Sequence, residues 1–139
     1  MKQNVLVDTG PLVAFLNQRD RYHSWAVSQL ADVEPPLRTC EPVLSEACFL
    51  LRSHEGGSRA VLQLMRRGLL TTPLRFEDEI DRISRLVTKY ADVPMSLADG
   101  CLVRMAELNL GKVVMTLDAD FRVYRMHGRQ VIPTIMPDR

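Results

Sequence analysis

Four acidic residues of this chain have the chemistry needed to hold divalent metal ions: Asp8, Glu46, Asp99 and Asp118. Their carboxylate oxygens are hard ligands, which suit Mg²⁺ or Mn²⁺. One or two such ions can orient a phosphodiester, activate a water molecule and stabilise the leaving oxygen. The four acids therefore predict a metal-dependent hydrolysis of phosphodiesters, provided that the fold brings them together.

Each acid also has an ordinary structural explanation. Asp8 could begin a turn, because Asp is common in turns. Asp99 could close a capping box with Ser96, and Asp118 could cap a short helix. Glu46 could be an acid of no special role near the start of a helix. Taken singly, Asp8 is explained equally well by a structural and by a functional role, and a structural role is the better explanation for the other three acids. The prediction therefore depends on the joint placement of all four.

Alternating strands and helices are expected to position these acids. Short apolar runs typical of buried strands cover residues 5–7, 37–40, 69–74, 113–116 and 130–135. The expected helices cover residues 11–16, 22–30, 42–54, 58–67, 76–90, 96–110 and 119–126. This order predicts an α/β fold, a three-layer α/β/α sandwich with a short parallel sheet of four to five strands.

The carboxyl ends of parallel strands form the edge where functional groups gather. Asp8 follows the first strand directly, and Asp118 follows the 113–116 strand after one residue. Asp99 and Glu46 lie in the first and second turns of helices that begin at the same edge. Two carboxylates about 4 Å apart repel by roughly 4 kcal/mol at an effective dielectric of about 20. A cluster at this edge therefore calls for a compensating divalent cation.

The composition is that of an ordinary globular chain, with 139 residues, 46% hydrophobic and 25% charged. This length can bury a core without disulfides, which predicts a single domain over residues 1–139. A formal net charge of +1 does not by itself indicate a nucleic-acid binder. The three cysteines lack CxxC spacing, and no apolar run is long enough for a signal peptide or a membrane span. We therefore expect free thiols, a cytoplasmic location and no membrane association.

Four segments carry a resemblance to a known family: VLVDTGPL (5–12), LSEA (44–47), PMSLADG (94–100) and VVMTLDADF (113–121). Through their order and spacing, the sequence resembles the PIN-domain nucleases, and within them the VapC-like toxins of VapBC-type toxin–antitoxin pairs. The resemblance spans essentially the whole chain. It implies a PIN-like fold, an Mg²⁺- or Mn²⁺-dependent endoribonuclease acting on RNA, a homodimer, and a cognate antitoxin protein that blocks the acidic cleft.

Residue by residue, the resemblance implies that Asp8, Glu46, Asp99 and Asp118 form the catalytic, metal-binding quartet. We expect Asp8 and Asp99 to ligate the metal directly and Asp118 to follow them in importance. Glu46 is expected to act through a water molecule.

Further residues are expected to support the quartet. Thr116 matches a small hydroxyl residue that often precedes the last acid, and Asp120 is an auxiliary acid. Thr9 and Ser96 are candidates for hydrogen bonds to the metal ligands.

Two positions depart from the commonest family pattern, because an acid often stands in place of Ser96 and alanine in place of Gly100. Both changes leave the quartet intact.

Two arginines, Arg122 and Arg125, are expected to contact RNA phosphates. They follow Asp118 on a short helix that starts at the acidic edge. The alternative is that they belong to a solvated charged face.

Two other functions compete with the nuclease. The first is a doubly wound phosphotransfer or phosphatase domain with Asp8 as the nucleophile. Gly10 stands where a haloacid-dehalogenase-type site would have a second Asp, and Val7 and Lys112 fit a receiver domain poorly. The second is a PIN-like module that binds partners without catalysis, which the intact quartet disfavours.

Overall fold

The computed structural model describes residues 1–138, so Arg139, the last residue of the expected domain, lies outside the described residues. At its centre is a five-stranded sheet whose strand pairs are all parallel. The strands, in the order in which they lie in the sheet, are β3 (Leu70–Thr71), β2 (Leu37–Arg38), β1 (Val5–Val7), β4 (Val113–Met115) and β7 (Thr134–Ile135). The expected parallel sheet of four to five strands is confirmed.

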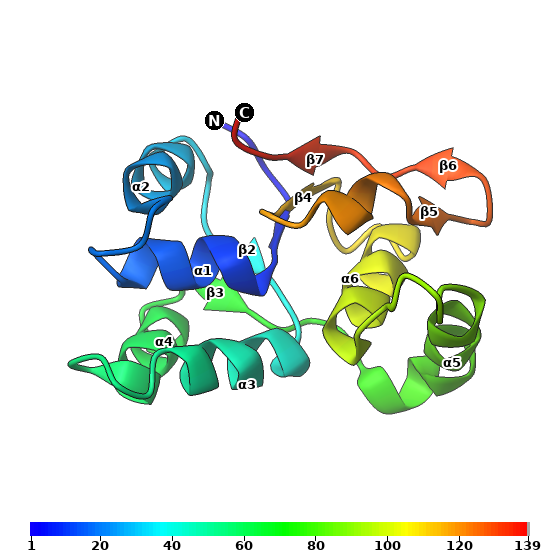
Figure 1. Ribbon diagram of the computed structural model, residues 1–139, viewed down its shortest axis with the longest axis horizontal. Helices are drawn as coiled ribbons and strands as arrows, with labels where there is room; N and C mark the ends of the chain where they lie inside the picture. Colours follow the sequence, from blue (N-terminus) through cyan, green and yellow to red (C-terminus); the bar gives the residue numbers. More distant parts are fainter. Residues whose placement is uncertain (139) are drawn as a thin grey trace.

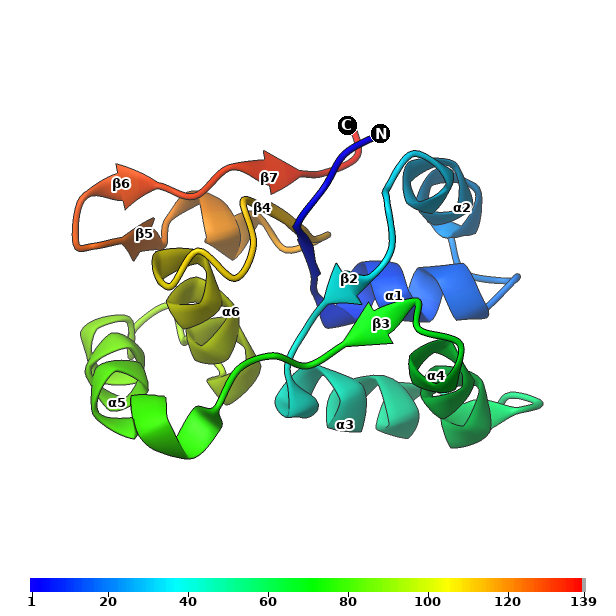
Figure 2. The same cartoon turned by 180° about the vertical axis from the view of Figure 1, so that it is seen from behind.

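Helices cover both sides of this sheet. The α-helices are α1 (Thr9–Leu16), α2 (His23–Ala31), α3 (Glu41–Leu50), α4 (Gly57–Arg66), α5 (Ile80–Lys89) and α6 (Leu97–Glu107). Figures 1 and 2 show α1 to α4 on one side of the molecule, and α5 and α6 on the other. Right-handed crossovers explain this division, because the chain moves outward from β1 to β3 and then crosses back to β4.

The central strand β1 fixes the start of the site. Its three residues, Val5, Leu6 and Val7, are at most 1% exposed. A strand buried on both faces is apolar throughout, which is why this run shows no alternation. Asp8 follows at its carboxyl end, so packing of β1 in the core determines where the first acid of the quartet lies.

The last part of the chain differs from the expected elements. The expected helix over 119–126 is a 3₁₀ turn, η2 (Ala119–Arg122), followed by β5 (Arg125–Met126). The expected strand over 130–135 is split into β6 (Gln130–Val131), which pairs antiparallel with β5, and β7. His127 and Gly128 have positive φ angles of 52° and 78°, which turn the chain into a hairpin. Pro133 cannot donate to a ladder, so it separates β6 from β7.

Several other elements lie within the ranges predicted from the sequence but are shorter than predicted. The 37–40 and 69–74 strands are reduced to two residues each, and the 42–54 helix ends at Leu50. The 76–90 helix begins as a 3₁₀ turn, η1 (Phe76–Glu79). Among residues 1–138, no helix has the length and apolar character required to span a bilayer.

A buried ion-pair network ties α6 to α5 and to the β5–β6 hairpin. The Glu107 side chain is 1% exposed and accepts two hydrogen bonds from Arg82, at 3.0 and 2.7 Å. It also accepts from Arg104 at 3.2 Å and from the His127 backbone N–H at 2.7 Å. Burial opposes ionisation, but the hydrogen bonds from Arg82 and His127 bring the pKa of Glu107 down to about 2.

We expect Glu107→Ala to lower the free energy of unfolding by about 3 kcal/mol, because it leaves the partly buried Arg82 and a backbone N–H without their partner. Arg104 loses one of its two acidic partners and keeps Glu79. Urea denaturation measures the change. Asp81→Ala is the matched control, since Asp81 is an exposed acid of α5. A Glu107→Ala loss no larger than that of the control would contradict the prediction.

Candidate active site

Asp8 lies at the junction of β1, β4 and α1. Its Oδ1 accepts from the Thr9 backbone N–H at 2.8 Å and so caps α1, while its backbone N–H donates to Met115 O at 3.0 Å. The side chain of Thr116 donates to Asp8 Oδ2 at 2.7 Å. Asp8 is 7% exposed. The helix-capping role and the position at the strand end therefore belong to the same carboxylate.

One hydroxyl group joins Asp8 to Asp118. Thr116 Oγ1, which donates to Asp8, also accepts from the Asp118 backbone N–H at 2.9 Å. Asp118 in turn caps η2, because its Oδ1 accepts from the Asp120 backbone N–H at 2.9 Å. The expected supporting role of Thr116 has a clear geometric basis, since its side chain links the two segments that carry these acids.

Asp99 occupies the first turn of α6, where it forms a capping box with Ser96. Ser96 Oγ accepts from the Asp99 backbone N–H at 3.0 Å, and Asp99 Oδ2 accepts from the Ser96 backbone N–H at 3.5 Å. A further donor is Tyr124, whose hydroxyl lies 2.8 Å from Asp99 Oδ2. Tyr124 was not among the residues that the sequence predicted for the site. Burial, and then the bond to Asp99, raise the pKa of Tyr124, so the phenol stays protonated and donates.

Glu46 is joined to the other acids through Thr9. The Thr9 hydroxyl donates to Glu46 Oε2 at 3.2 Å, which connects α3 to the start of α1. Helix α3 contacts both α1 and α6, and Figure 1 shows the N-terminal parts of the three helices near the centre of the molecule. The Thr9 side chain was expected to donate a hydrogen bond to one of the four acids, and it donates one to Glu46.

The four acids line one open cleft of about 420 Å³. Asp120 at its rim, Thr9 and Ser96 also line it, as do Gly10, Leu50, Pro94 and Leu117. No Lys, Arg or His is among these lining residues of the described chain. The structure thus brings the whole quartet together in one cleft, with the hydroxyl groups of Thr9 and Thr116 bonded to its members.

A model of the PIN domain family matches residues 5–125, which include all four acids. The chain belongs to the PIN domain family. This match stops within the β5–β6 hairpin, so the second strand of the hairpin and β7 lie beyond it.

Known proteins resemble this PIN domain over most of its length. Ribonuclease VapC26 of Mycobacterium tuberculosis is 28% identical over 117 residues, which are 82% of this chain and 86% of the relative. The structure of VapC20 of M. tuberculosis, described as a toxin that cleaves the sarcin–ricin loop, superposes with a TM-score of 0.75 at 20% identity, covering 86% of this chain and 93% of VapC20. The structure of VapBC2 from Rickettsia felis, bound to a DNA fragment from its promoter, gives a TM-score of 0.62 at 11% identity, covering 96% and 98%.

The electrostatics of this PIN domain reflect the clustering of its acids. Burial raises the pKa of Asp8 to about 6, and the charges of Asp99 and Asp118 add to this effect. Burial also raises the pKa of Asp99, with Asp118 contributing. At the rim, partial desolvation and then the charge of Asp118 raise the pKa of Asp120. Each of these shifts is one that a bound cation would reverse.

The cleft offers free oxygen ligands but not a formed coordination site. Among residues 1–138, no three Asp, Glu, His or Cys side chains are placed to share one ion as they stand. The hydrogen bonds of the described residues leave one oxygen of each of three acids unused: Asp99 Oδ1, Asp118 Oδ2 and Glu46 Oε1. Carboxylate oxygens around an open, polar cleft fit the hard cations Mg²⁺ or Mn²⁺.

The two arginines predicted to bind RNA lie outside the cleft lining. Arg125 Nη1 donates to the backbone carbonyls of Arg122, Val123 and Tyr124, at 2.7, 3.1 and 3.0 Å, so this guanidinium closes the end of η2. Arg122 is exposed. Contact of either residue with RNA stays a prediction.

Gly100, one of the two expected departures from the family pattern, lies where α5 packs closely on α6. A Cβ atom at this position would lie 3.2 Å from Val87 Cγ2 and 3.5 Å from Ile83 Cγ2. The glycine therefore lets the two helices approach at the residue that follows Asp99.

We expect the metal-free protein to lose stability as pH rises, relative to Asp8→Asn. The pKa of Asp8 is raised in the folded protein, from 3.8 to about 6, so its protonated form favours folding. This contribution is complete only well below 3.8, the pKa of Asp8 in the unfolded chain, and is lost as pH rises through about 6. The difference in free energy of unfolding between wild type and Asp8→Asn should fall by about 2.4 kcal/mol between about pH 4 and about pH 7.5. Urea denaturation in EDTA measures it, and a pH-independent difference would contradict it.

Proposed function

We propose that this PIN domain is a metal-dependent endoribonuclease that hydrolyses RNA phosphodiester bonds. The observation that carries the proposal is the convergence of four acids, from four separate segments, on one cleft. No Lys, Arg or His is among the described residues that line it. An acidic cleft repels a phosphodiester unless divalent ions lie between them, so the arrangement favours metal-assisted chemistry on a phosphate. The ribonuclease name of the M. tuberculosis relative supports RNA as the substrate.

In the proposed mechanism, Asp8, Asp99 and Asp118 would hold Mg²⁺ or Mn²⁺ directly, and Glu46 would act through a water molecule. Both Asp8 oxygens already accept one hydrogen bond each, so Asp8 would use a remaining lone pair. When bound, the ion supplies Lewis-acid activation of water and neutralises charge on the phosphate. Thr116 holds Asp8 in a fixed relation to the Asp118 segment, through bonds of 2.7 and 2.9 Å. These bonds keep the carboxylates in place before substrate arrives, which lowers the cost of assembling the site.

We further propose that the protein acts in the cytoplasm as the toxin of a toxin–antitoxin pair. The VapC and VapBC names of the similar proteins support this role, and the free cysteines Cys40, Cys48 and Cys101 suit a reducing compartment. An apolar depression of about 340 Å³ supports a protein partner, the antitoxin. It lies between α1, α2 and α4, and its lining includes Leu12, Phe15, Val27, Leu30 and Leu64. The expected homodimer is testable by light scattering of the purified protein.

The proposed activity is tested with purified protein and an end-labelled structured RNA. Internal cleavage is expected with Mg²⁺ or Mn²⁺ and none with EDTA. Cleavage that persists in EDTA would refute metal dependence. If RNA stays intact while acetyl phosphate labels Asp8, the phosphotransfer alternative replaces the nuclease. Intact RNA without metal binding would indicate the non-catalytic module.

A further inference from the structure

A buried hydroxyl group behind the cleft contacts one of the four acids. Tyr124 is 0% exposed, and its Oη lies 2.8 Å from Asp99 Oδ2. Tyr124 does not line the cleft, so it reaches the site only through Asp99. The contact joins the segment after η2 to the first turn of α6.

The position of this hydroxyl group is set by the packing of its ring. Tyr90 contacts the Tyr124 ring edge-on, with centroids 5.1 Å apart and an interplanar angle of 69°. Phe121 contacts it similarly, at 5.2 Å and 84°. Aromatic rings held edge-to-face on two sides have little freedom to move. Tyr124 is therefore a donor whose position is fixed by packing, and it restrains the Asp99 carboxylate that accepts its hydrogen bond.

The two hydrogen bonds that restrain the Asp99 carboxylate are accepted by the same oxygen. The Ser96 backbone N–H and the Tyr124 hydroxyl each donate to Oδ2, at 3.5 and 2.8 Å. The shorter bond comes from Tyr124, so Tyr124 is the stronger restraint. Among the hydrogen bonds of residues 1–138, none uses Oδ1 of Asp99. The Asp99 residue lines the cleft together with Asp8 and Asp118.

We propose that Tyr124 is a positioning residue for metal binding, which fixes Oδ2 of Asp99 so that Oδ1 is presented to the ion. This inference rests on the proposed metal-dependent function. Groups that hydrogen-bond to metal ligands typically change metal affinity by about 10- to 100-fold when they are removed.

The test compares Tyr124→Phe with Tyr90→Phe. Both variants lose one hydroxyl from the same aromatic cluster and keep the ring. The Tyr90 hydroxyl accepts from the Arg125 backbone N–H at 3.0 Å and does not contact an acid of the cleft. Calorimetric titration should show that Tyr124→Phe binds Mn²⁺ at least about tenfold more weakly than the wild type does. Tyr90→Phe should bind Mn²⁺ with wild-type affinity.

Cleavage assays over a range of Mn²⁺ concentrations add a second readout. Tyr124→Phe should cleave RNA slowly at low Mn²⁺ and recover as the concentration exceeds its own Kd. A structural role alone would lower the unfolding temperature in EDTA and leave the Mn²⁺ affinity of the folded protein unchanged, which would overturn the inference. If wild-type protein binds no Mn²⁺, the proposed function fails as well. Equal affinities of wild type and Tyr124→Phe refute only the role of Tyr124.

A measurement on the wild-type protein covers the case in which Tyr124→Phe does not fold. The chain has three tyrosines, so ring ¹³C labelling gives few signals. The Tyr124 ring signals should shift with Mg²⁺ occupancy, while those of Tyr22, at the start of α2, should not. Tyr124 signals that stay unchanged at saturating Mg²⁺ would overturn the inference.

Discussion

Asp8→Asn and Asp99→Asn should each lower the rate of RNA cleavage by at least about a thousandfold, which corresponds to about 4 kcal/mol of lost transition-state stabilisation. Each substitution removes a negative charge that would hold the ion. At position 8, asparagine is preferred to alanine because its side-chain oxygen can still accept the 2.8 Å hydrogen bond from the Thr9 backbone N–H, which caps α1. Single-turnover cleavage of a fluorescently labelled RNA measures the effect.

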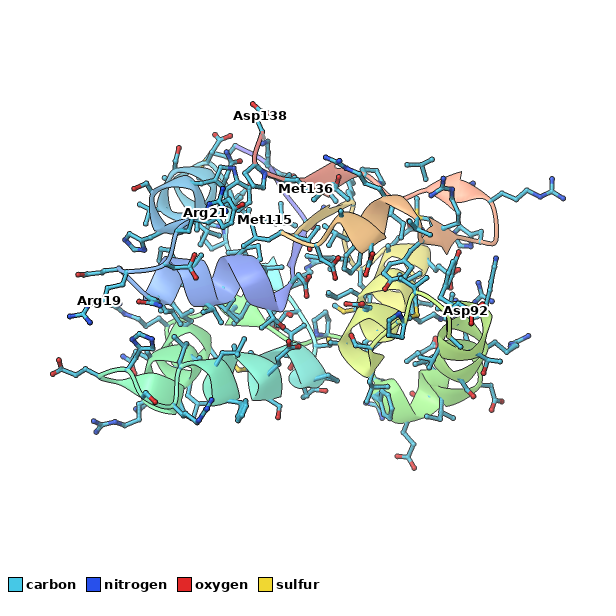
Figure 3. The ribbon with its side chains drawn as sticks, viewed as in Figure 1. Arg19, Arg21, Asp92, Met115, Met136 and Asp138 are labelled. Carbon is cyan, nitrogen blue, oxygen red and sulfur yellow. The ribbon has the colours of Figure 1, made fainter. Side chains whose placement is uncertain are left out.

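The matched control for these variants is Asp92→Asn. Asp92 is exposed, and Figure 3 shows it beside α5, far from Met115 at the end of β4. This variant removes the same charge from the whole protein without touching the cleft, so wild-type cleavage is expected. If Asp99→Asn cleaves as fast as Asp92→Asn, the assignment of the quartet is wrong.

The second large effect concerns stability. Mn²⁺ at about 100 times its Kd should raise the free energy of unfolding by about 2.7 kcal/mol. For a chain of this size, that corresponds to an increase of about 10 °C in the unfolding temperature. The physical reason is the uncompensated charge of the cleft, where burial and the neighbours Asp99 and Asp118 raise the pKa of Asp8 to about 6.

Two controls separate specific binding from general screening by salt. NaCl at matched ionic strength screens exposed charges but cannot replace a ligated ion, so it should produce a much smaller shift. The double variant Asp8→Asn/Asp99→Asn should lose most of the Mn²⁺ effect. Equal shifts with NaCl and Mn²⁺, or a full Mn²⁺ shift in the double variant, would contradict a metal site in the cleft.

The positions of the four acids could be predicted because they follow from strand order. Asp8 and Asp118 come after parallel strands that are direct neighbours in the sheet, with Val7 opposite Met115. Glu46 and Asp99 lie near the starts of helices that leave the same edge. Both facts depend on local apolar runs and caps, which the sequence displays directly. The structure places the acids in one cleft, and their roles in catalysis and metal binding stay predictions.

The region after Asp118 could not be predicted in the same way. Two-residue strands carry no period that distinguishes them from a short helix, and Gly128 is the main local sign of the hairpin. Tyr124 was missed for a different reason. Its partner, Asp99, lies 25 residues earlier, and no pattern along the chain marks a buried hydroxyl that will meet a distant carboxylate.

The capping roles of Asp8 and Asp118 have a consequence for how this fold changes over evolutionary time. Both side chains satisfy backbone N–H groups at the starts of α1 and η2, so their loss would loosen the secondary structure even in a descendant that had abandoned catalysis. Such a descendant should retain Asp, Asn or Ser at these positions. Glu46 lies within α3 and caps nothing, so selection for folding alone would not preserve it. Among relatives of this chain, loss of the acid at position 46 should therefore be the earliest mark of an inactive lineage.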